Sequence, residues 1–304
     1  MVFDIIILGT SAAGASAAIY LARRNINFKM LGFDFGGEMA LSGEISNYPG
    51  FGETNGIELS QKFLAHLKQY NIKPELGSKV SSLEKKDDVY VVKFNGSEHQ
   101  AKSVILATGS HPRELGVPGE KELRAKGLSY CTVCDGPLFQ DKDVVIIGGG
   151  DSASEAGIMM NDIARQVRVL TINQEMKGDA SLIKRLSSLP KVKLIANAQT
   201  TKISGNGFVS GIEYKDLISG EMKTIEAQGV FIHIGMVPNT DFVKIPELKL
   251  NELGEIIIDK SCQTNVPGLF AAGDLTDIRY KQIGIAVGQG ICAALSSVDY
   301  LNKL

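Results

Sequence analysis

The sequence predicts an α/β fold made of two similar domains, because one pattern occurs twice in the chain. Residues 2–8 form an apolar run typical of a buried parallel strand, and the glycine turn Gly9–Gly14 and a helix over 15–24 follow it. About 140 residues later the order returns as a strand over 144–147, the glycine turn Gly148–Ala153 and a helix. A strand–turn–helix unit of this kind opens a doubly wound domain. We therefore expect two Rossmann-like, three-layer domains, the second inserted in the first.

Each position in these turns has a physical reason that points to a bound dinucleotide. The first glycine makes the tight turn, the third lets the helix pack on the strand, and the helix N-terminus faces a pyrophosphate. In the first copy the middle position is Ser11 rather than glycine, and its hydroxyl can donate to a phosphate. The second copy has the permitted alanine, Ala153, at the third position. One such turn also occurs in βαβ units that bind no nucleotide, whereas two copies favour two dinucleotide sites.

The rest of the chain alternates strands, turns and helices. Asn95-Gly96 lies between two strands and predicts a hairpin, and Asn206-Gly207 and Gly220 predict further hairpin turns. A connector containing proline and glycine, 111–119, and a second that begins and ends with proline, 238–246, are expected to separate the domains. Further strands are expected over 27–31, 89–94, 97–101, 104–106, 167–170 and 229–234, and a strand followed by a turn over 267–274. Helices are expected over 59–70, 154–164 and from about 283 to 301, and a long loop over 36–52.

Composition excludes several functional classes. The chain has 304 residues, 44% of them hydrophobic and 22% charged, and a net charge of −2, so no basic footprint for nucleic acid or for a membrane surface is expected. Strand residues begin at position 2, and we expect neither a signal peptide nor an apolar run long enough to span a bilayer. Four cysteines are too few for a disulfide scaffold, which favours a reducing compartment, the cytoplasm.

The sequence that carries chemistry is Cys131-Thr132-Val133-Cys134-Asp135. Two cysteines with two residues between them can close an exchangeable disulfide, or form half of a zinc site. Zinc needs further ligands at fixed spacing, but Cys262 and Cys292 stand apart in the sequence and are expected to be small core residues, and the four histidines are scattered. His233, in an apolar strand, is expected to be a core histidine with its hydrogen bonds satisfied. A redox dithiol is therefore the favoured interpretation.

An ordered set of motifs gives the chain a family resemblance. It resembles the low-molecular-weight thioredoxin reductases and the reductase portion of the alkyl hydroperoxide reductase flavoprotein. The resemblance implies an FAD-binding domain over 1–115 and 243–304, a pyridine-nucleotide domain with the cysteines over 116–242, and a homodimer whose connectors act as hinges. The motifs are Gly9 to Gly14, Gly36-Gly37, Asn47-Tyr48-Pro49-Gly50, Ala107-Thr108-Gly109, the cysteine motif through Gly136, Gly148 to Ala153, Pro238-Asn239-Thr240 and Gly273-Asp274.

The resemblance also implies roles for individual residues. Cys134 would lie against the flavin and take electrons from it, Cys131 would attack the disulfide of a thioredoxin- or glutaredoxin-like partner, and Asp135 would act as general acid and base. Asp-Gly is also a common turn sequence, so Asp135 has a structural alternative. The implied cofactor-binding residues are Gly9, Ser11, Ala13, Gly14, Gly37, Glu38, Asn47, Val80, Ala107, Gly109, Gly273, Asp274, Lys281, Gln282 and Ile283 for FAD, and Gly148, Gly150, Asp151 and Ser152 for the pyridine nucleotide.

Within the FAD set, two residues have specific expected interactions. Asp274 would accept hydrogen bonds from the ribityl hydroxyls, a role compatible with that of a helix cap. Lys281 stands where relatives often place a cation near the flavin ring, and the following helix would direct its positive end toward the ring. Glu38 replaces the glutamine that is usual in relatives, without being expected to abolish FAD binding.

The electron donor is where the sequence departs from its relatives. NADPH-specific members carry an arginine-rich run after the strand that follows the second glycine turn, because a 2′-phosphate needs paired cationic donors. Here this stretch reads Thr171-Ile172-Asn173-Gln174-Glu175-Met176-Lys177, with one lysine beside a glutamate. NADPH is therefore disfavoured, NADH stays open through Asn173 or Glu175, and ferredoxin stays open as a donor. The alternatives are a ferredoxin–NAD(P) reductase, which would need no dithiol, and a flavin-binding regulator, which would need no second glycine turn.

Overall fold

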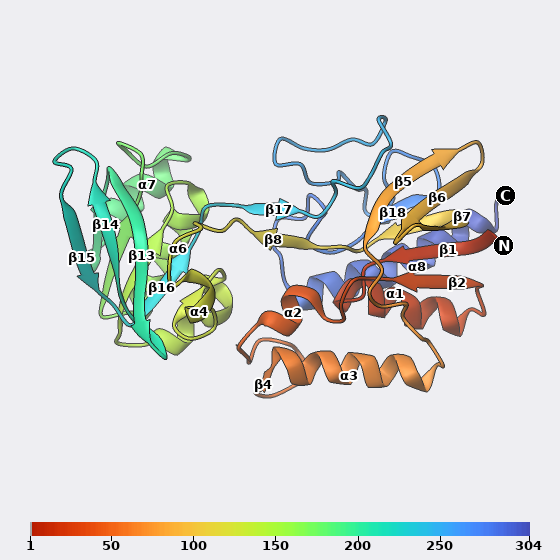
Figure 1. Cartoon of the computed structure of the whole chain (residues 1–304), viewed down its shortest axis with the longest axis horizontal. Helices are drawn as coiled ribbons and strands as arrows, with labels where there is room; N and C mark the ends of the chain where they lie inside the picture. The colour runs from red at the N-terminus through yellow and green to blue at the C-terminus, as the bar shows by residue number, and fades with distance from the viewer. Residues whose placement is uncertain (1) are drawn as a thin grey trace. The chain divides into compact units, whose positions relative to one another are not determined.

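The computed structural model describes residues 2–304, which form two compact units (Figure 1). The first consists of the residues up to His111 together with Val237–Leu304, and the second is Pro112–Met236. The chain thus leaves the first unit, builds the second, and returns to complete the first. The α/β class predicted from the sequence, with one Rossmann-like domain inserted in another, is confirmed.

The first unit is built on a six-stranded sheet in the order β2 (Phe28–Leu31), β1 (Val2–Leu8), β7 (Ser97–Leu106), β6 (Val89–Phe94) and β5 (Val80–Lys86), with β18 (Leu269–Ala271) also paired to β7. β1 pairs in parallel with both β2 and β7. The first part of β7 pairs with β6 in the antiparallel hairpin predicted around Asn95-Gly96, and its last residues pair in parallel with β18. The carboxyl ends of β1, β7 and β18 therefore share one sheet edge.

Alternation along β1 divides the first unit's core into two layers. Ile5 and Ile7 pack under α1 (Ala12–Arg23) and α8 (Ile283–Leu301), which run side by side on one face of the sheet (Figure 1). Ile6 and Leu8 pack on the other face, against side chains of the β5–β6 hairpin and of residues 242–258. The remaining elements are α2 (Gly37–Leu41), β3 (Glu44–Ile45), β4 (Thr54–Asn55), α3 (Gly56–Gln69), and the connector strands β8 (Ser110–Pro112) and β17 (Met236–Pro238).

The second unit repeats this design with a parallel sheet in the order β12 (Val192–Ile195), β11 (Gln166–Leu170), β10 (Asp143–Ile147), β16 (Gly229–Ile232) and β9 (Leu128–Ser129). On one face, Val144 and Ile146 pack with the cluster that includes α6 (Asp151–Ile163) and Leu186 of α7 (Ala180–Ser187). On the other, Val145 and Ile147 pack with side chains of a separate antiparallel sheet, β13 (Ala198–Asn206), β14 (Phe208–Asp216) and β15 (Met222–Glu226). Short helices α4 (Glu120–Leu123) and α5 (Thr132–Asp135) and the 3₁₀ turn Gly136–Phe139 complete the unit.

Several elements differ from the sequence expectation. The stretch 36–52 was expected to be a loop, but it contains α2, whose amphipathic signal is too short to recognise. β5 and α7 were not predicted, since β5 is mostly polar and α7 follows a cap, Asp179, rather than an apolar run. The strands expected at 97–101 and 104–106 are one continuous strand, β7. Both long helices after the glycine turns begin within the turn itself, earlier than predicted.

α8 corrects the expectation that no apolar segment is long enough to span a bilayer. Among the helices of residues 2–304, it is the one long and apolar enough to cross a membrane by length and composition. One face of α8 packs closely on α1, because a Cβ on Gly290 would lie 2.1 Å from the backbone oxygen of Ala13 in α1. The absence of a side chain at Gly290 therefore lets the two helix backbones approach closely.

The two glycine turns are held in the same way. A Cβ on Gly9, which has a φ of +121°, would lie 2.0 Å from the carbonyl oxygen of Ala107, the residue that follows β7. A Cβ on Gly148 would lie 2.1 Å from the carbonyl oxygen of His233, which follows β16. Only glycine fits either position, because in both units the turn is pressed against the end of the neighbouring strand.

The next position in each turn shows a reciprocal exchange of side chains. In the first unit Thr10 contacts Gly32, on which a Cβ would lie 2.3 Å from the threonine Oγ1. In the second unit Gly149 is on the turn and Thr171 follows the strand, and a Cβ on Gly149 would again lie 2.3 Å from the threonine Oγ1. Each contact holds one threonine and one glycine, so the space accepts one side chain only.

This exchange predicts a coupled stability effect. Gly149→Thr should lower the free energy of unfolding by about 1–3 kcal/mol through overpacking against Thr171. The double change with Thr171→Gly recreates the arrangement of the first unit and should recover more than half of that loss, a coupling of roughly 1–2 kcal/mol. Urea unfolding followed by circular dichroism measures both. Gly150→Ala is the matched control, because a Cβ on Gly150 has no atom within 4 Å; additive losses in the double variant would contradict the account.

Candidate active site

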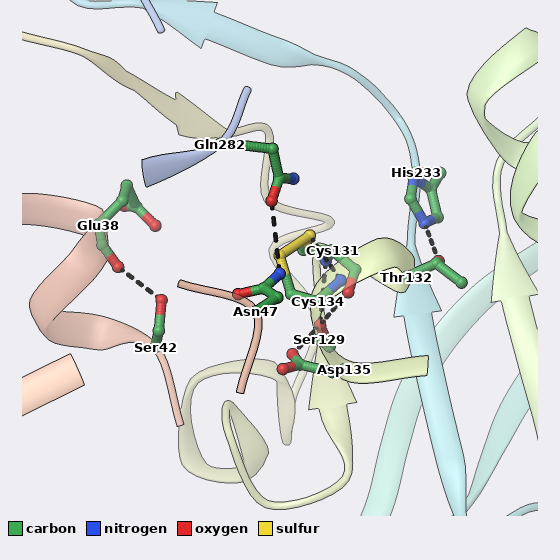
Figure 2. Close-up of a disulfide and its surroundings, with 10 residues drawn as sticks. All are labelled: Glu38, Ser42, Asn47, Ser129, Cys131, Thr132, Cys134, Asp135, His233 and Gln282. Atoms are coloured by element: carbon green, nitrogen blue, oxygen red, sulfur yellow. Dashed lines mark hydrogen bonds between the residues drawn. A yellow bond between two sulfur atoms is a disulfide. The ribbon is translucent and has the colours of Figure 1, made fainter. Parts of the chain in front are cut away.

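The cysteine motif forms a disulfide on a short helix of the second unit (Figure 2). Cys131 is the cap residue of α5 and Cys134 lies in its only turn, and both side chains are half-buried. The backbone N–H of Cys134 donates to the Cys131 sulfur at 3.2 Å. A donor aimed at this sulfur favours its thiolate form when the disulfide is reduced. The structure thus joins the two cysteines that the sequence singled out.

Asp135 is held beside the disulfide by a hydroxyl that sequence reasoning did not identify. The Oγ of Ser129, at the end of β9, donates to the Asp135 carboxylate, and the backbone N–H of Cys131 donates to the same Oγ at 3.0 Å (Figure 2). One side chain therefore fixes both the carboxylate and the start of the cysteine helix. The sequence shows that Ser129 lies close to the motif, but it does not show that the Ser129 hydroxyl points toward Asp135.

His233 binds the cysteine motif through the threonine between the two cysteines. Its Nε2 lies 2.6 Å from the Thr132 hydroxyl (Figure 2). Burial lowers the pKa of His233 to about 4, so the ring is neutral at pH 7. Its backbone N–H donates to the carbonyl of Ile147, and its own carbonyl oxygen lies so close to Gly148 that a Cβ there would clash with it. One ring nitrogen of His233 is hydrogen-bonded, in partial agreement with the expectation of a satisfied core histidine, and the same residue links the second glycine turn to the dithiol helix.

The first unit presents a cradle at the N-terminus of α1. Ser11 does not cap the helix; its hydroxyl donates to the carbonyl of Gly36 at 2.5 Å. A Cβ on Gly37, which has a φ of +51°, would lie 3.6 Å from Ser11, and one on Gly273 would lie 3.3 Å from Ala13. Two glycine loops therefore border the start of α1, where backbone N–H groups lack helical partners. This arrangement fits a pyrophosphate and hence FAD.

Residues distant in sequence also meet near this cradle. The Asn47 amide donates to the Gln282 side chain at 3.4 Å (Figure 2), and Ile283 packs with Ala12 and Met39. The N–H of Gly273 donates to Gln289 of α8 at 2.8 Å. Gln289 was not among the predicted site residues, although it is a long polar side chain in the interior of an otherwise small and apolar helix. The predicted residues Asn47, Gln282 and Ile283 thus border the same cradle.

The acids and the lysine around Gly273 have defined partners. Burial raises the pKa of Asp274 above its ordinary value, with Glu38 adding to the effect and Lys281 opposing it. Lys281 pairs with Glu255 at 2.8 Å and also donates to the carbonyl of Thr276. A buried carboxyl with hydrogen-bonding capacity fits the ribityl hydroxyls of FAD. The role of Lys281 beside the ring stays a prediction, as does that of Val80, which is half-buried at the start of β5.

In the second unit, the loop after β11 folds over the glycine turn. The N–H of Lys177 donates to the carbonyl of Gly149 at 2.6 Å, and the N–H of Asp179 donates to the Asp151 carboxylate at 2.7 Å. Asn173 donates to the Thr171 hydroxyl at 3.3 Å. Thr171 and Asn173 therefore line the turn, while Glu175 and Lys177 are exposed. The side chains that line the turn are therefore a neutral hydroxyl and a neutral amide.

The start of the second connector, which belongs to the first unit, is hydrogen-bonded to residues that lead into the first connector. Asn239 donates from its amide to the carbonyl of Thr108 at 2.8 Å, and its N–H donates to Gly109 at 2.9 Å. Its Oδ1 also contacts the His111 ring at 2.7 Å. In the second unit Arg113 donates from its N–H to the carbonyl of Gly235 at 2.9 Å. The two connectors therefore run together within each unit.

The chain belongs to a family described as pyridine nucleotide-disulphide oxidoreductases, which matches residues 3–290. Its fold is that of the thioredoxin reductases, as the resemblance in the sequence implied, and the family implies FAD and a pyridine nucleotide. Thioredoxin reductase from Streptococcus pyogenes MGAS5005 superposes with a TM-score of 0.94 at 35% identity, covering 100% of this chain and 99% of that one.

Two kinds of longer relative are more similar in sequence. A protein named NADH dehydrogenase from Bacillus subtilis is 46% identical over 301 residues, and a component of the alkyl hydroperoxide reductase of Staphylococcus aureus is 42% identical over 302. Both alignments cover 99% of this chain, and the chain spans 59% of the length of each. A ferredoxin-flavin thioredoxin reductase from Clostridium acetobutylicum superposes with a TM-score of 0.56 at 31% identity, covering 100% and 98% of the two chains.

The buried His233 predicts a pH-dependent stability. In the unfolded chain this histidine binds a proton near its ordinary pKa of 6.5, whereas in the folded chain it binds one only near pH 4. Stability is therefore fully present above pH 6.5 and is lost as the pH falls toward 4, with a slope of at most ~1.4 kcal/mol per pH unit. His233→Gln should remove this part of the slope in urea unfolding. His66→Gln, on the exposed face of α3, should leave it unchanged; equal slopes for wild type and His233→Gln would contradict the account.

Proposed function

We propose that the protein is an FAD-dependent thioredoxin-disulfide reductase, active in the cytoplasm as a homodimer, whose Cys131–Cys134 pair reduces a thioredoxin- or glutaredoxin-like protein. The first unit would bind FAD and the second the pyridine nucleotide. The observation that carries the proposal is the half-buried Cys131–Cys134 disulfide. The Ser129 hydroxyl is hydrogen-bonded both to the Cys131 N–H, at the start of the disulfide helix, and to the Asp135 carboxylate. A ferredoxin–NAD(P) reductase would have no use for this cysteine pair.

The residues support a defined order of steps. FAD, when bound, would accept two electrons from the donor and pass them to the disulfide. In the resulting dithiol, the Cys131 thiolate, favoured by the Cys134 N–H, attacks the partner's disulfide and forms a mixed disulfide. Cys134 then attacks the Cys131 sulfur, which releases the partner as a dithiol and restores the disulfide. Asp135 supplies the proton to the leaving thiolate and later accepts one from Cys134.

Asp135 provides the direct test of this order. Asp135→Asn should slow reduction of a thioredoxin disulfide by about 10²-fold or more, because it removes the proton carrier, while the rate of flavin reduction by the donor stays unchanged. Ser129→Ala should have a smaller effect on the same step, since it removes only the bond that orients the carboxylate. Stopped-flow absorbance at the flavin band separates the two half-reactions. Unaltered turnover of Asp135→Asn with thioredoxin would refute the acid–base role.

For the electron donor, we propose NADH, or a donor that is not a nicotinamide, rather than NADPH. The loop over the second glycine turn offers Lys177 as its one cation between 171 and 179, and Glu175 stands two residues from it. A 2′-phosphate is recognised by paired cationic donors, and a carboxylate would repel it. The 46% identical relative named NADH dehydrogenase supports NADH, and the ferredoxin-flavin thioredoxin reductase supports ferredoxin as the other donor.

Anaerobic bleaching of the yellow holoenzyme tests the donor. NADH should reduce the flavin at least about tenfold more efficiently than NADPH, equivalent to ~1.4 kcal/mol. Glu175→Arg should raise the efficiency ratio of NADPH to NADH about fivefold by adding a cation for the 2′-phosphate, worth ~1 kcal/mol. Glu221→Arg, an exposed acid in the β14–β15 turn of the same unit, is the matched control and should leave the ratio unchanged. Faster reduction by NADPH would overturn this part of the proposal, and reduction by ferredoxin alone would identify the second donor class.

A further inference from the structure

The two cysteines outside the redox motif meet in the first unit. Cys262 ends a tight turn, with its N–H donating to the carbonyl of Asp259 and its own carbonyl accepting from Ala271 of β18, both at 3.0 Å. Cys292 lies in the middle of α8. The sequence places them 30 residues apart and gave no sign of contact. Cys262 is buried as expected, but Cys292 is only partly buried and is not a sealed core residue.

Contacts from both sides place the two sulfur atoms together. The Cys292 thiol donates to the carbonyl of Lys260 at 3.5 Å, within the turn that Cys262 ends. The Cys292 sulfur raises the pKa of Cys262 and the backbone N–H of Ala293, the next residue of α8, lowers it, so both groups lie near the Cys262 sulfur. Both side chains pack in the cluster formed by α1, α8 and β18. Proximity of this kind, between a fixed turn and a fixed helix, is what a disulfide needs.

The two thiols differ in reactivity. Burial, together with the neighbouring Cys292 sulfur, raises the pKa of Cys262 to about 12, so this thiol stays protonated at neutral pH. Cys292 is partly exposed to solvent, whereas Cys262 is buried. An oxidant therefore meets Cys292 first, and Cys262 acts as the resolving thiol.

We propose that Cys262 and Cys292 form a second, oxidisable dithiol that hydroperoxides convert to a disulfide joining the 259–262 turn to α8. The Cys292 sulfur attacks one peroxide oxygen, the O–O bond breaks, and the proton of the Cys292 thiol passes to the departing oxygen, which leaves as an alcohol or water; Cys292 becomes a sulfenic acid. The Cys262 sulfur then attacks the Cys292 sulfur, the S–O bond breaks, and the hydroxide leaves as water with the proton of Cys262. The two sulfur atoms lose two electrons in total, and the peroxide accepts them.

This disulfide would act on the helix that borders the FAD cradle. Gln289, one turn before Cys292 in α8, accepts the N–H of Gly273, and Gly290 packs on Ala13. A bond from Cys292 to the turn would restrain α8 against the loop that leads into β18, and would close a loop of about 30 residues. The proposal is independent of the client that Cys131 and Cys134 reduce.

Peptide mapping of the wild-type holoenzyme tests the proposal without any variant. After full reduction and removal of the reductant, the protein is treated with hydrogen peroxide, alkylated, and digested with trypsin without further reduction. Trypsin places Cys262 in peptide 261–279 and Cys292 in peptide 282–303, whereas Cys131 and Cys134 share peptide 127–142. The expected product is peptide 261–279 linked to 282–303, which a disulfide of the first pair cannot mimic.

Two outcomes would overturn the inference. One is Cys292 recovered as a sulfinic acid with Cys262 alkylated, which would mean that the buried thiol cannot reach the oxidised sulfur. The other is both cysteines alkylated after the Cys131–Cys134 disulfide has fully re-formed. A second readout is thermal: peroxide should raise the melting temperature of the wild-type holoenzyme by about 5 °C relative to Cys262→Ser, which lacks the resolving thiol. An equal response of the two proteins would also contradict the proposal.

Discussion

The rest of the structure depends on one steric constraint that is met twice. In each unit, the first glycine of the turn lies against the carbonyl at the end of the neighbouring strand, Ala107 in one case and His233 in the other. A side chain at either glycine would push the helix away from the sheet edge, and the free N–H groups of that helix would no longer face a phosphate. Because His233 also binds Thr132, the constraint in the second unit reaches the dithiol helix.

The chemistry of the cysteine pair then follows from a few hydrogen bonds within the second unit. Ser129 holds the carboxylate of Asp135 and the N–H of Cys131, and the neutral ring of His233 holds Thr132 between the cysteines. The α5 helix has a single turn, so it has little stability of its own. These side-chain contacts supply the rigidity that thiol exchange needs, and they leave Cys131 and Cys134 half-buried rather than sealed.

Much of the fold could be predicted from sequence because its signals are local. The apolar runs of β1 and β10, the glycine turns after them and the Asn95-Gly96 hairpin depend on a few adjacent residues. The elements that were missed, such as α2 and β5, are short or polar and are stabilised by tertiary contacts. The pairings of Asn47 with Gln282, and of Cys262 with Cys292, join residues that only the packing of α8 brings together. No sequence pattern encodes such meetings.

The central claim is that the Cys131–Cys134 disulfide receives electrons from the bound flavin, and counting electrons tests it most directly. In an anaerobic titration with dithionite, the holoenzyme should take up about four electrons per FAD, two for the flavin and two for the disulfide. The variant with both Cys131→Ser and Cys134→Ser should take up about two. A wild-type enzyme that is fully reduced by only about two electrons per FAD would contradict the claim.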